Sequence, residues 1–372
     1  MKEAIMLYLL VGTYCQQEDP GIFVYDFNTE TGKVEYVSSV SGISNPSYLA
    51  LSTDEAFVYT VGENGSENSS ALALNFDKES GMLTILNSEN TKGGSPCYIS
   101  VDSGNNFVVT ANYVGGNISV FPIREDGRLS PVSQIINYVP NKSHLHTVRF
   151  SPDEKYLFAT DLGTDKIYRF KVKADADDGQ YLEQEGDHAA ELDKGSGPRH
   201  LTFHPNGKYL YCINELMGHI TAFAYDDGKI TRLQQIMSDI SEGVGGKGSA
   251  DIHVSPDGRF LYASNRLRQD GIAIYSINQE NGELTSVGYQ LTGVHPRNFI
   301  LTPNGRYLLV ANRDTNNIQI FSRNEETGLL VLTDNEIMLS APVCLKFASV
   351  CNALFGRTAP VCEQALVLKK NI

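Results

Sequence analysis

Short runs of alternating apolar and polar residues, each ended by turn residues, make up most of this chain. The clearest is residues 197–215, GPRHLTFHPNGKYLYCINE, in which HLTF and KYLYCI carry β-branched and aromatic residues at period two. Between them, HPNGK supplies a proline that fixes φ and a glycine that allows positive φ. The pattern predicts a β-hairpin, and because a short hairpin brings its two ends together, we expect Arg199 and Glu215 to meet opposite the turn.

The same hairpin pattern recurs along the chain. Aligned on the sixth residue before each turn, the repeats start at Pro46, Pro96, Leu145, Pro198, Ser249, Pro296 and Pro342, so successive starts are 46 to 53 residues apart. A third and usually a fourth strand follow each hairpin, as in 219–233 and 271–287. Four short strands per repeat without helical periodicity are typical of a propeller blade. Seven starts therefore predict an all-β, seven-bladed β-propeller with four-stranded blades.

The two ends of the chain supply complementary parts of one blade. Only one strand, PVCLKFAS, follows Pro342, whereas YLLVGTY, GIFVYDFN and KVEYVSS near the N-terminus match the second, third and fourth strands. Pairing them would close the ring and remove open sheet edges. The apolar run from Ile5 to Val11 is too short to span a membrane, so we interpret it as a buried strand. A linear β-solenoid is the alternative, and the complementary half-blades argue against it.

Two segments match no blade element. Residues 174–196 are acidic and polar, and we expect a solvated loop or excursion there. Residues 350–372 follow the closing strand, and we expect a packed extension or a disordered tail. The predicted organisation is one propeller domain over residues 1–349 and an extension of unknown structure over 350–372.

Composition and charge narrow the class of protein. With 41% hydrophobic and 20% charged residues, the 372-residue chain is typical of soluble globular proteins. Its net charge of −14 and the lack of a Lys/Arg cluster argue against nucleic acid or an anionic membrane as a partner. Six cysteines without metal-ligand spacing favour buried thiols in a reducing cytoplasm, with a pairing among the late cysteines as the alternative. The absence of Trp argues against a WD-type propeller.

The repeat register indicates where chemistry could occur. In a propeller the innermost strand lines the central channel, so the start of that strand and the end of the next meet at one face. Titratable side chains occupy these positions in the third to sixth repeats: His146, Arg199, His200, Glu215, Asp251, Arg266, Arg297 and Arg313. Because unpaired buried charges are costly, these groups must pair, face water or bind a ligand. They could form an ion-pair lining between blades, a polyanion pocket, or a hydrolytic site with His or Glu as base and arginines binding an oxyanion or phosphate.

Other polar residues carry weaker signals. We interpret His204, which opens a turn, as a surface residue, and we expect His144 to face the other side of the strand from His146. Cys97 falls in the channel ring, where a lone cysteine is more often a small buried residue than a nucleophile. The sequence contains no GxSxG, P-loop or DxDxDG-type calcium loop, and no metal or cofactor is predicted.

Four stretches, HLHTVRFSPD, GPRHLTFHPNGKYLYCINEL, SPDGRFLYASNR and HPRNFILTPNGRYLLVAN, resemble the lactonase family of seven-bladed propellers, which includes bacterial 6-phosphogluconolactonases. The resemblance covers residues 7–348 approximately. A fungal carboxymuconate-lactonizing enzyme is similar in fold, and its proposed catalytic His, Arg, Glu and Arg correspond to His146, Arg199, Glu215 and Arg266.

This resemblance implies hydrolysis of 6-phospho-D-glucono-1,5-lactone to 6-phosphogluconate, the second step of the oxidative pentose phosphate pathway. Either His146 or Glu215 would activate water, and Arg199 or Arg266 would stabilise the oxyanion. We expect His200, Arg297 and Arg313 to hold the phosphate, with Asp251 also among the substrate-binding residues. The expected partner is a small, phosphorylated sugar-acid lactone, and we expect the protein to be a monomer or weak homo-oligomer. Another sugar-acid or muconate-type lactone, or a non-catalytic binding propeller, remains the alternative.

Overall fold

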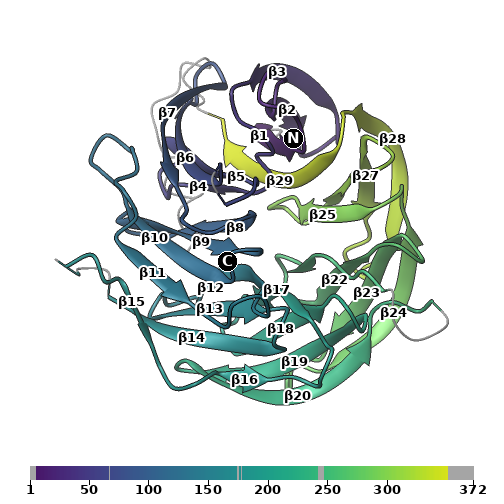
Figure 1. Cartoon of the computed structure of the whole chain (residues 1–372). Helices are drawn as coiled ribbons and strands as arrows, with labels where there is room; N and C mark the ends of the chain where they lie inside the picture. Colours follow the sequence, from purple (N-terminus) through teal and green to yellow (C-terminus); the bar gives the residue numbers. More distant parts are fainter. Residues whose placement is uncertain (1–5, 67, 174–175, 177, 242–246, 351–372) are drawn as a thin grey trace.

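Seven β-sheets form a ring around a central channel in the computed structural model, which describes residues 6–66, 68–173, 176, 178–241 and 247–350 (Figure 1). The predicted all-β, seven-bladed propeller is therefore confirmed. Within these ranges no helix has the length and apolar character needed to cross a membrane. Residues 351–372 lie outside the described residues, as does the expectation for a C-terminal extension beyond Val350.

Each blade is an antiparallel sheet in which the strands follow one another from the channel outwards. The first blade is β29 (Pro342–Ser349), β1 (Met6–Thr13), β2 (Ile22–Asn28) and β3 (Val34–Val40). The second is β4 (Leu49–Leu51), β5 (Phe57–Gly62), β6 (Ser70–Asp77) and β7 (Met82–Asn90). The third is β8 (Pro96–Val101), β9 (Phe107–Asn112), β10 (Asn117–Pro122) and β11 (Gln134–Asn137).

The remaining four blades continue around the ring. The fourth is β12 (Leu145–Phe150), β13 (Tyr156–Asp161) and β14 (Lys166–Val172), with β15 (Leu182–Gln184) and β16 (Ala190–Glu191) both paired to β14. The fifth is β17 (Pro198–Phe203), β18 (Tyr209–Asn214), β19 (His219–Asp226) and β20 (Lys229–Met237). The sixth is β21 (Ile252–Val254), β22 (Phe260–Asn265), β23 (Gly271–Ile277) and β24 (Leu284–Leu291). The seventh is β25 (Pro296–Leu301), β26 (Tyr307–Asn312), β27 (Asn317–Arg323) and β28 (Leu330–Met338).

The first blade joins the two ends of the chain as predicted. β1 pairs with β2 on one side and with β29 on the other, with Leu9 opposite Phe347 in the β29 register. Leu9, Leu10 and Val11 are fully buried, so the N-terminal apolar run is a buried strand from Met6 onwards. The ring is closed by main-chain hydrogen bonds between residues far apart in sequence.

The apolar faces of neighbouring blades pack against one another to form the core. One cluster lies between the fifth and sixth blades and includes Tyr211 and Ile252, and another joins the sixth and seventh blades through Tyr262 and Val310. A repeated tyrosine also crosses between blades: Tyr211 and Tyr262 donate to turn carbonyls of the next blade, at Gly282 (2.9 Å) and Gly328 (2.7 Å). Packing between blades therefore buries both faces of inner strands such as β9 and β22, whereas outer strands such as β20 keep exposed residues.

The hairpin turns share one backbone conformation. The fourth turn residue has a positive φ of 70° to 71° where it is Gly207, Gly258 or Gly305. Glu55, Asn105 and Glu154 occupy the same position in the second to fourth blades and adopt the same left-handed conformation, with φ of 54° to 59°. Non-glycine residues rarely adopt this conformation, so the surrounding turn hydrogen bonds must hold it in those three repeats.

Two expectations from the sequence for regions away from the channel are wrong. Part of the acidic segment 174–196 forms the outer strands β15 and β16 rather than a loop alone, because the fourth blade needs an outer partner for β14. His204 is buried, not at the surface. Its Nε2 donates to the Gly258 carbonyl (2.8 Å) and its Nδ1 accepts from the backbone of Asn206 (3.1 Å), because the turns of neighbouring blades pack together.

Candidate active site

A β-bulge interrupts the pairing of the two innermost strands in five blades. The register shifts between Pro96 and Tyr98, Leu145 and Thr147, Pro198 and His200, and Pro296 and Asn298, and in the first blade between Pro342 and Cys344. A bulge inserts one extra residue and re-aims its side chain. The extra residues here are Cys97, His146, Arg199, Arg297 and Val343, which include three of the candidate site residues predicted from the sequence.

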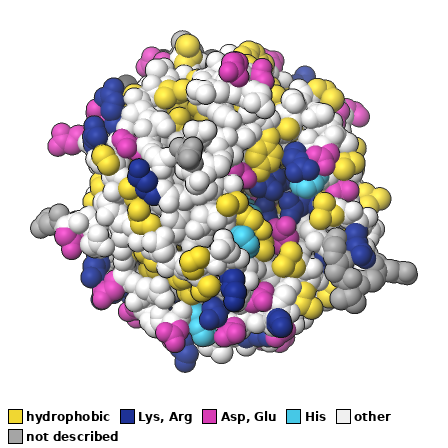
Figure 2. Space-filling view, in the orientation of Figure 1, with side chains coloured by type: hydrophobic (Ala, Val, Ile, Leu, Met, Phe, Trp, Pro, Cys, Tyr) yellow, Lys and Arg dark blue, Asp and Glu magenta, His cyan; other side chains and the backbone are white. Residues whose placement is uncertain are grey.

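The bulges let sequence neighbours line one pocket. Adjacent residues of a regular strand face opposite sides. Here a small polar pocket in the channel is lined by the consecutive pairs Arg199 and His200, and Arg297 and Asn298, together with Ser47, Tyr48, Cys97 and Val343. Figure 2 shows Lys or Arg and His side chains gathered right of the centre of this face, near the position of β25 in Figure 1.

Glu215 lies between two buried arginines. Arg199 Nε is 2.8 Å from Glu215 Oε2, and Arg266 Nη2 is 3.1 Å from Oε1. The predicted contact between Arg199 and Glu215 is therefore confirmed. Burial alone would raise the pKa of Glu215, but the two guanidiniums more than offset this and lower it. Burial, helped by Arg199, lowers the pKa of Arg266 to about 9, which leaves it positively charged at neutral pH.

Each arginine contacts a histidine, and each histidine in turn contacts an aspartate. Nη1 of Arg199 is 3.2 Å from His200 Nε2, and His200 Nδ1 is 2.7 Å from Asp251 Oδ1. Nη1 of Arg266 is likewise 3.2 Å from His295 Nε2, and His295 Nδ1 is 3.5 Å from Asp314 Oδ2. We call Arg199, His200 and Asp251 the inner arm, and Arg266, His295 and Asp314 the outer arm. Glu215 joins the two arms.

Both histidines of the arms are neutral. Burial and the neighbouring arginine lower the pKa of His200 to about 3, and the same two causes lower that of His295 to about 3. Since a guanidinium only donates, Nε2 of each ring must accept, and Nδ1 must carry the proton that faces the aspartate. The arms therefore hold their charges on arginine and carboxylate only.

His146 differs from the histidines of the arms because Nδ1 has no partner. Its ring is 4% exposed and lies 5.0 Å from the His200 ring, centroid to centroid. Nδ1 is buried without a hydrogen bond among the described residues. Burial, together with the charge of Arg199, holds the pKa of His146 well below its usual value, so the ring is neutral. A neutral imidazole with an unpartnered nitrogen can accept or donate a proton toward a ligand.

Arg297 and Arg313 occupy different environments. Arg297 lies in the pocket, 4.0 Å from Glu63 and over the ring of Tyr14 (5.3 Å). Tyr14 also donates to Glu63 (2.9 Å). Arg313 is partly exposed and pairs with Asp314 through Nε (2.5 Å) and Nη2 (3.1 Å). The structure thus brings most predicted residues together, with Arg313 at the outer edge.

His295 was not predicted from the sequence, and His144 was predicted on the wrong side of its strand. Both directly precede the first residue of a repeat, a position that was not compared around the ring. The ring of His144 stacks on Tyr113 (4.5 Å), and Tyr113 also contacts the edge of His146 (5.9 Å), so the strand does not separate the two histidines. Comparing the position before each repeat start would have found both.

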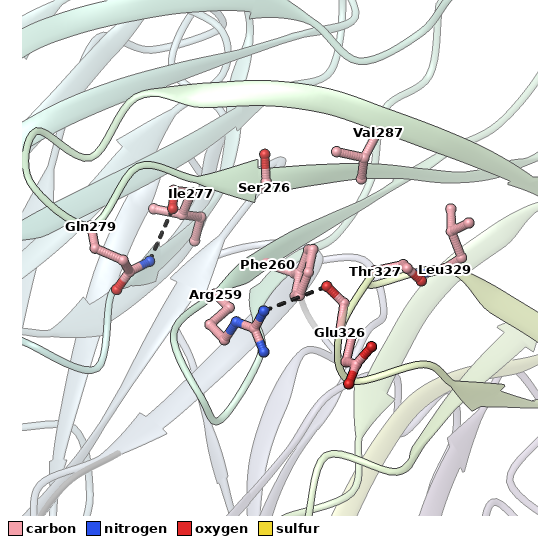
Figure 3. Close-up of a pocket in the computed structure, with 9 residues that line it drawn as sticks. All are labelled: Arg259, Phe260, Ser276, Ile277, Gln279, Val287, Glu326, Thr327 and Leu329. Carbon is pink, nitrogen blue, oxygen red and sulfur yellow. Dashed lines mark hydrogen bonds between the residues drawn. The ribbon is translucent and has the colours of Figure 1, made fainter.

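Other parts of the structure are weaker candidates for a functional site. Cys97 is buried, and burial raises the pKa of its thiol, which disfavours a nucleophilic role. No three His, Cys, Asp or Glu side chains within the described ranges are grouped so as to hold a metal ion. A second hollow lies between the sixth and seventh blades (Figure 3), where Arg259 donates to the Glu326 carbonyl. Its lining contains no histidine or cysteine.

The fold and site define a class of protein. The model of the seven-bladed β-propeller lactonase family matches residues 8–347, and the chain belongs to this family. A 6-phosphogluconolactonase of Formosa agariphila is 38% identical over 91% of this chain and 98% of its own length.

Two solved structures are similar throughout. One, from Bacteroides fragilis, is described as a candidate 6-phosphogluconolactonase, with 47% identity, a TM-score of 0.88, and coverage of 94% of this chain and 99% of its own. The other is a periplasmic gluconolactonase of Pseudomonas aeruginosa, with 32% identity, a TM-score of 0.87, and coverage of 93% and 100%.

Proposed function

We propose that this protein hydrolyses 6-phospho-D-glucono-1,5-lactone to 6-phosphogluconate. The observation that carries the proposal is a neutral, buried His146 with an unpartnered Nδ1 beside a pocket that Arg199 and Arg297 line. The names of the similar proteins supply the substrate, and the lactonase family supplies the reaction class.

His146 suits the role of base better than Glu215. Glu215 is held by two arginines and its pKa is lowered, so a proton transferred to it would disrupt both ion pairs. His146 has no competing partner at Nδ1 and is unprotonated at neutral pH. We therefore assign Glu215 to holding the arginines and His146 to accepting the proton of water.

The reaction follows from these roles. Water attacks the lactone carbonyl carbon as its proton passes to His146, and the carbonyl electrons move onto oxygen, where Arg199 donates a hydrogen bond. The bond between that carbon and the ring oxygen then breaks, and the ring oxygen takes the proton from the imidazolium. The products are an open-chain carboxylic acid, which ionises, and a neutral His146.

Arg297 and Arg313 are the better candidates for the phosphate. Both nitrogens of His200 and both oxygens of Asp251 already have protein partners, which argues against direct substrate contact. Arg297 lines the pocket, and Arg313 lies at the outer edge, where it pairs with the exposed Asp314. A guanidinium fork suits a phosphate. The name of the Pseudomonas aeruginosa relative favours unphosphorylated gluconolactone as a second candidate substrate.

The experiment is hydrolysis of freshly generated 6-phosphogluconolactone, coupled to 6-phosphogluconate dehydrogenase, with gluconolactone measured separately and the spontaneous rate subtracted. His146→Ala should lower kcat by about 100-fold or more, as expected for loss of a general base. His204→Gln is the matched control, because His204 is a buried histidine at the turn end of β17. Equal rates with and without protein on the phosphorylated lactone would overturn the proposal.

We also propose a cytoplasmic location and a monomer or weak homo-oligomer. A phosphorylated sugar lactone is an intracellular metabolite, and the four described cysteines, Cys15, Cys97, Cys212 and Cys344, are free thiols, as a reducing compartment favours. Cell fractionation and sedimentation of the purified protein test these points. Recovery in the periplasm would contradict the first.

A further inference from the structure

We propose that Asp251 is a positioning residue for Arg199: it holds His200 in the Nδ1–H tautomer, so that Nε2 of His200 accepts from Arg199 and orients the guanidinium at the pocket. The proposal rests on the proposed function only in that Arg199 faces the lactone. The hydrogen-bond arrangement itself can be measured without substrate.

The carboxylate of Asp251 is fully used by the protein. It is 1% exposed, and its oxygens accept from five donors: His200 Nδ1 (2.7 Å), the backbone N of Ile252 (3.0 Å), His253 Nε2 (3.0 Å), the backbone N of Phe299 (3.3 Å) and the side-chain amide of Asn298. Such a carboxylate has little capacity left for a substrate hydroxyl. Its effect on the reaction must pass through one of these partners.

The tautomer of His200 is determined from both sides of the ring. The ionised carboxylate of Asp251 can only accept, so Nδ1 must carry a proton. Arg199 can only donate, so Nε2 must present its lone pair to Nη1 at 3.2 Å. Carboxylates set the tautomer of functional histidines in this way when they bind the opposite ring nitrogen. Losing the carboxylate would free the ring to turn an N–H toward the guanidinium.

The contacts of Arg199 explain why this orientation matters. Nε is paired with Glu215 (2.8 Å), and Nη1 donates to the Ala250 carbonyl (2.5 Å) as well as facing His200. Because the guanidinium is planar, fixing Nε and Nη1 also fixes the direction of Nη2. We assign Nη2 as the donor that reaches into the pocket. Without His200, rotation about the last side-chain bonds would move that donor away from the carbonyl oxygen.

The backbone also explains why an aspartate is required. One carboxylate oxygen accepts from the N–H of Ile252 and the other from the N–H of Phe299. Asn at position 251 would place an amide nitrogen against one of these donors in either orientation. We therefore expect Asp251→Asn to fold less stably, so variants of His200 provide the decisive tests.

The first experiment is spectroscopic. In protein labelled with ¹⁵N at histidine, the His200 signals are assigned by their loss in His200→Gln. At pH 7 the expected result is a protonated Nδ1 and an unprotonated Nε2. A protonated Nε2, in either the other neutral tautomer or the imidazolium, would overturn the proposal whether or not the protein hydrolyses any lactone.

The second experiment uses two replacements of His200. The amide of Gln can donate to Asp251 through nitrogen and accept from Arg199 through oxygen, whereas Leu can do neither. His200→Leu should lower kcat by about 100-fold with KM changed only a few-fold, as for loss of an oriented oxyanion donor. The kcat of His200→Gln should be at least about tenfold higher than that of His200→Leu. Equal kcat values for the two variants would overturn the proposal, and thermal unfolding of each verifies that it is folded. An inactive wild type would instead contradict the proposed function and leave the decision to the spectroscopic test.

Discussion

The two arms beside Glu215 contain the same residue types in the same order but differ in burial. In the inner arm, Arg199, His200 and Asp251 are each less than 5% exposed, and the histidine lies 2.7 Å from the aspartate. The outer arm ends in Asp314, whose side chain is 42% exposed and lies 3.5 Å from His295. Similar contacts therefore operate at low effective dielectric on one side and in contact with water on the other.

This difference assigns different tasks to the arms. A buried, fully bonded carboxylate holds one geometry, because any displacement leaves donors unsatisfied. Asp314 shares its carboxylate with Arg313 at the surface, where an incoming anion can compete for the same guanidinium. We infer that the inner arm orients Arg199 and that the outer arm can adjust when the substrate enters.

The largest effect is expected from Glu215→Gln, which breaks both arms at once. Arg199 and Arg266 would lose their shared counter-ion while remaining buried, so we expect a loss of about 3–5 kcal/mol in unfolding free energy. Activity should fall about 1000-fold, because Arg199, the proposed oxyanion donor, would move. Denaturant unfolding and steady-state kinetics provide the measurements.

Glu183→Gln is the control for that change, because Glu183 pairs with one exposed lysine, Lys173, at 2.8 Å. Its removal should change the unfolding free energy by less than about 1 kcal/mol. If Glu215→Gln changed the unfolding free energy as little as Glu183→Gln, the central role assigned to Glu215 would be wrong.

Arginine-to-lysine replacements separate the two arms. Lysine retains the charge but cannot reproduce the planar fork that links glutamate, histidine and a backbone carbonyl. Arg199→Lys should lower kcat about 100-fold, and Arg266→Lys should lower it about tenfold, because only Arg199 lines the pocket. A greater loss for Arg266→Lys would reverse the assignment of the oxyanion donor. The measurement is kcat for both variants on the same lactone.

The pH dependence of stability tests the neutral histidines. The pKa of His200 is about 3 in the folded protein and about 6.5 when unfolded, so the unfolded chain binds more protons between these values. Stability should therefore be lost as the pH falls from 6.5, by about 2 kcal/mol at pH 5 from His200 alone. His200→Gln should flatten this dependence in denaturant unfolding at pH 7 and pH 5. The same slope in both proteins would show that His200 is not held neutral.

The smallest effect is expected at the exposed end of the outer arm. Asp314→Asn removes a partly exposed pair with Arg313, so unfolding free energy should change by about 0–1 kcal/mol and kcat by less than about threefold. Thermal unfolding and kinetics in low and high salt measure this. A loss comparable to that of Arg199→Lys would contradict the difference between the arms.

Much of the architecture follows from the order of the residues. The spacing of the hairpins is sufficient to predict seven blades, and the half-blades at the two ends are sufficient to predict the closure of β1 against β29, because strand alternation and turn residues are local signals. The same register brings Arg199 to Glu215, since the two lie at the ends of one hairpin.

The contacts between blades could not be predicted from the sequence and are seen only in the folded chain. The register alone does not reveal that bulges turn His146, Arg199 and Arg297 toward the channel, because a bulge breaks the period on which that register depends. The partners of His295 and the burial of His204 likewise come from neighbouring blades. Local sequence determines which face of a strand is apolar, whereas the closing of the ring decides which polar groups from separate blades meet.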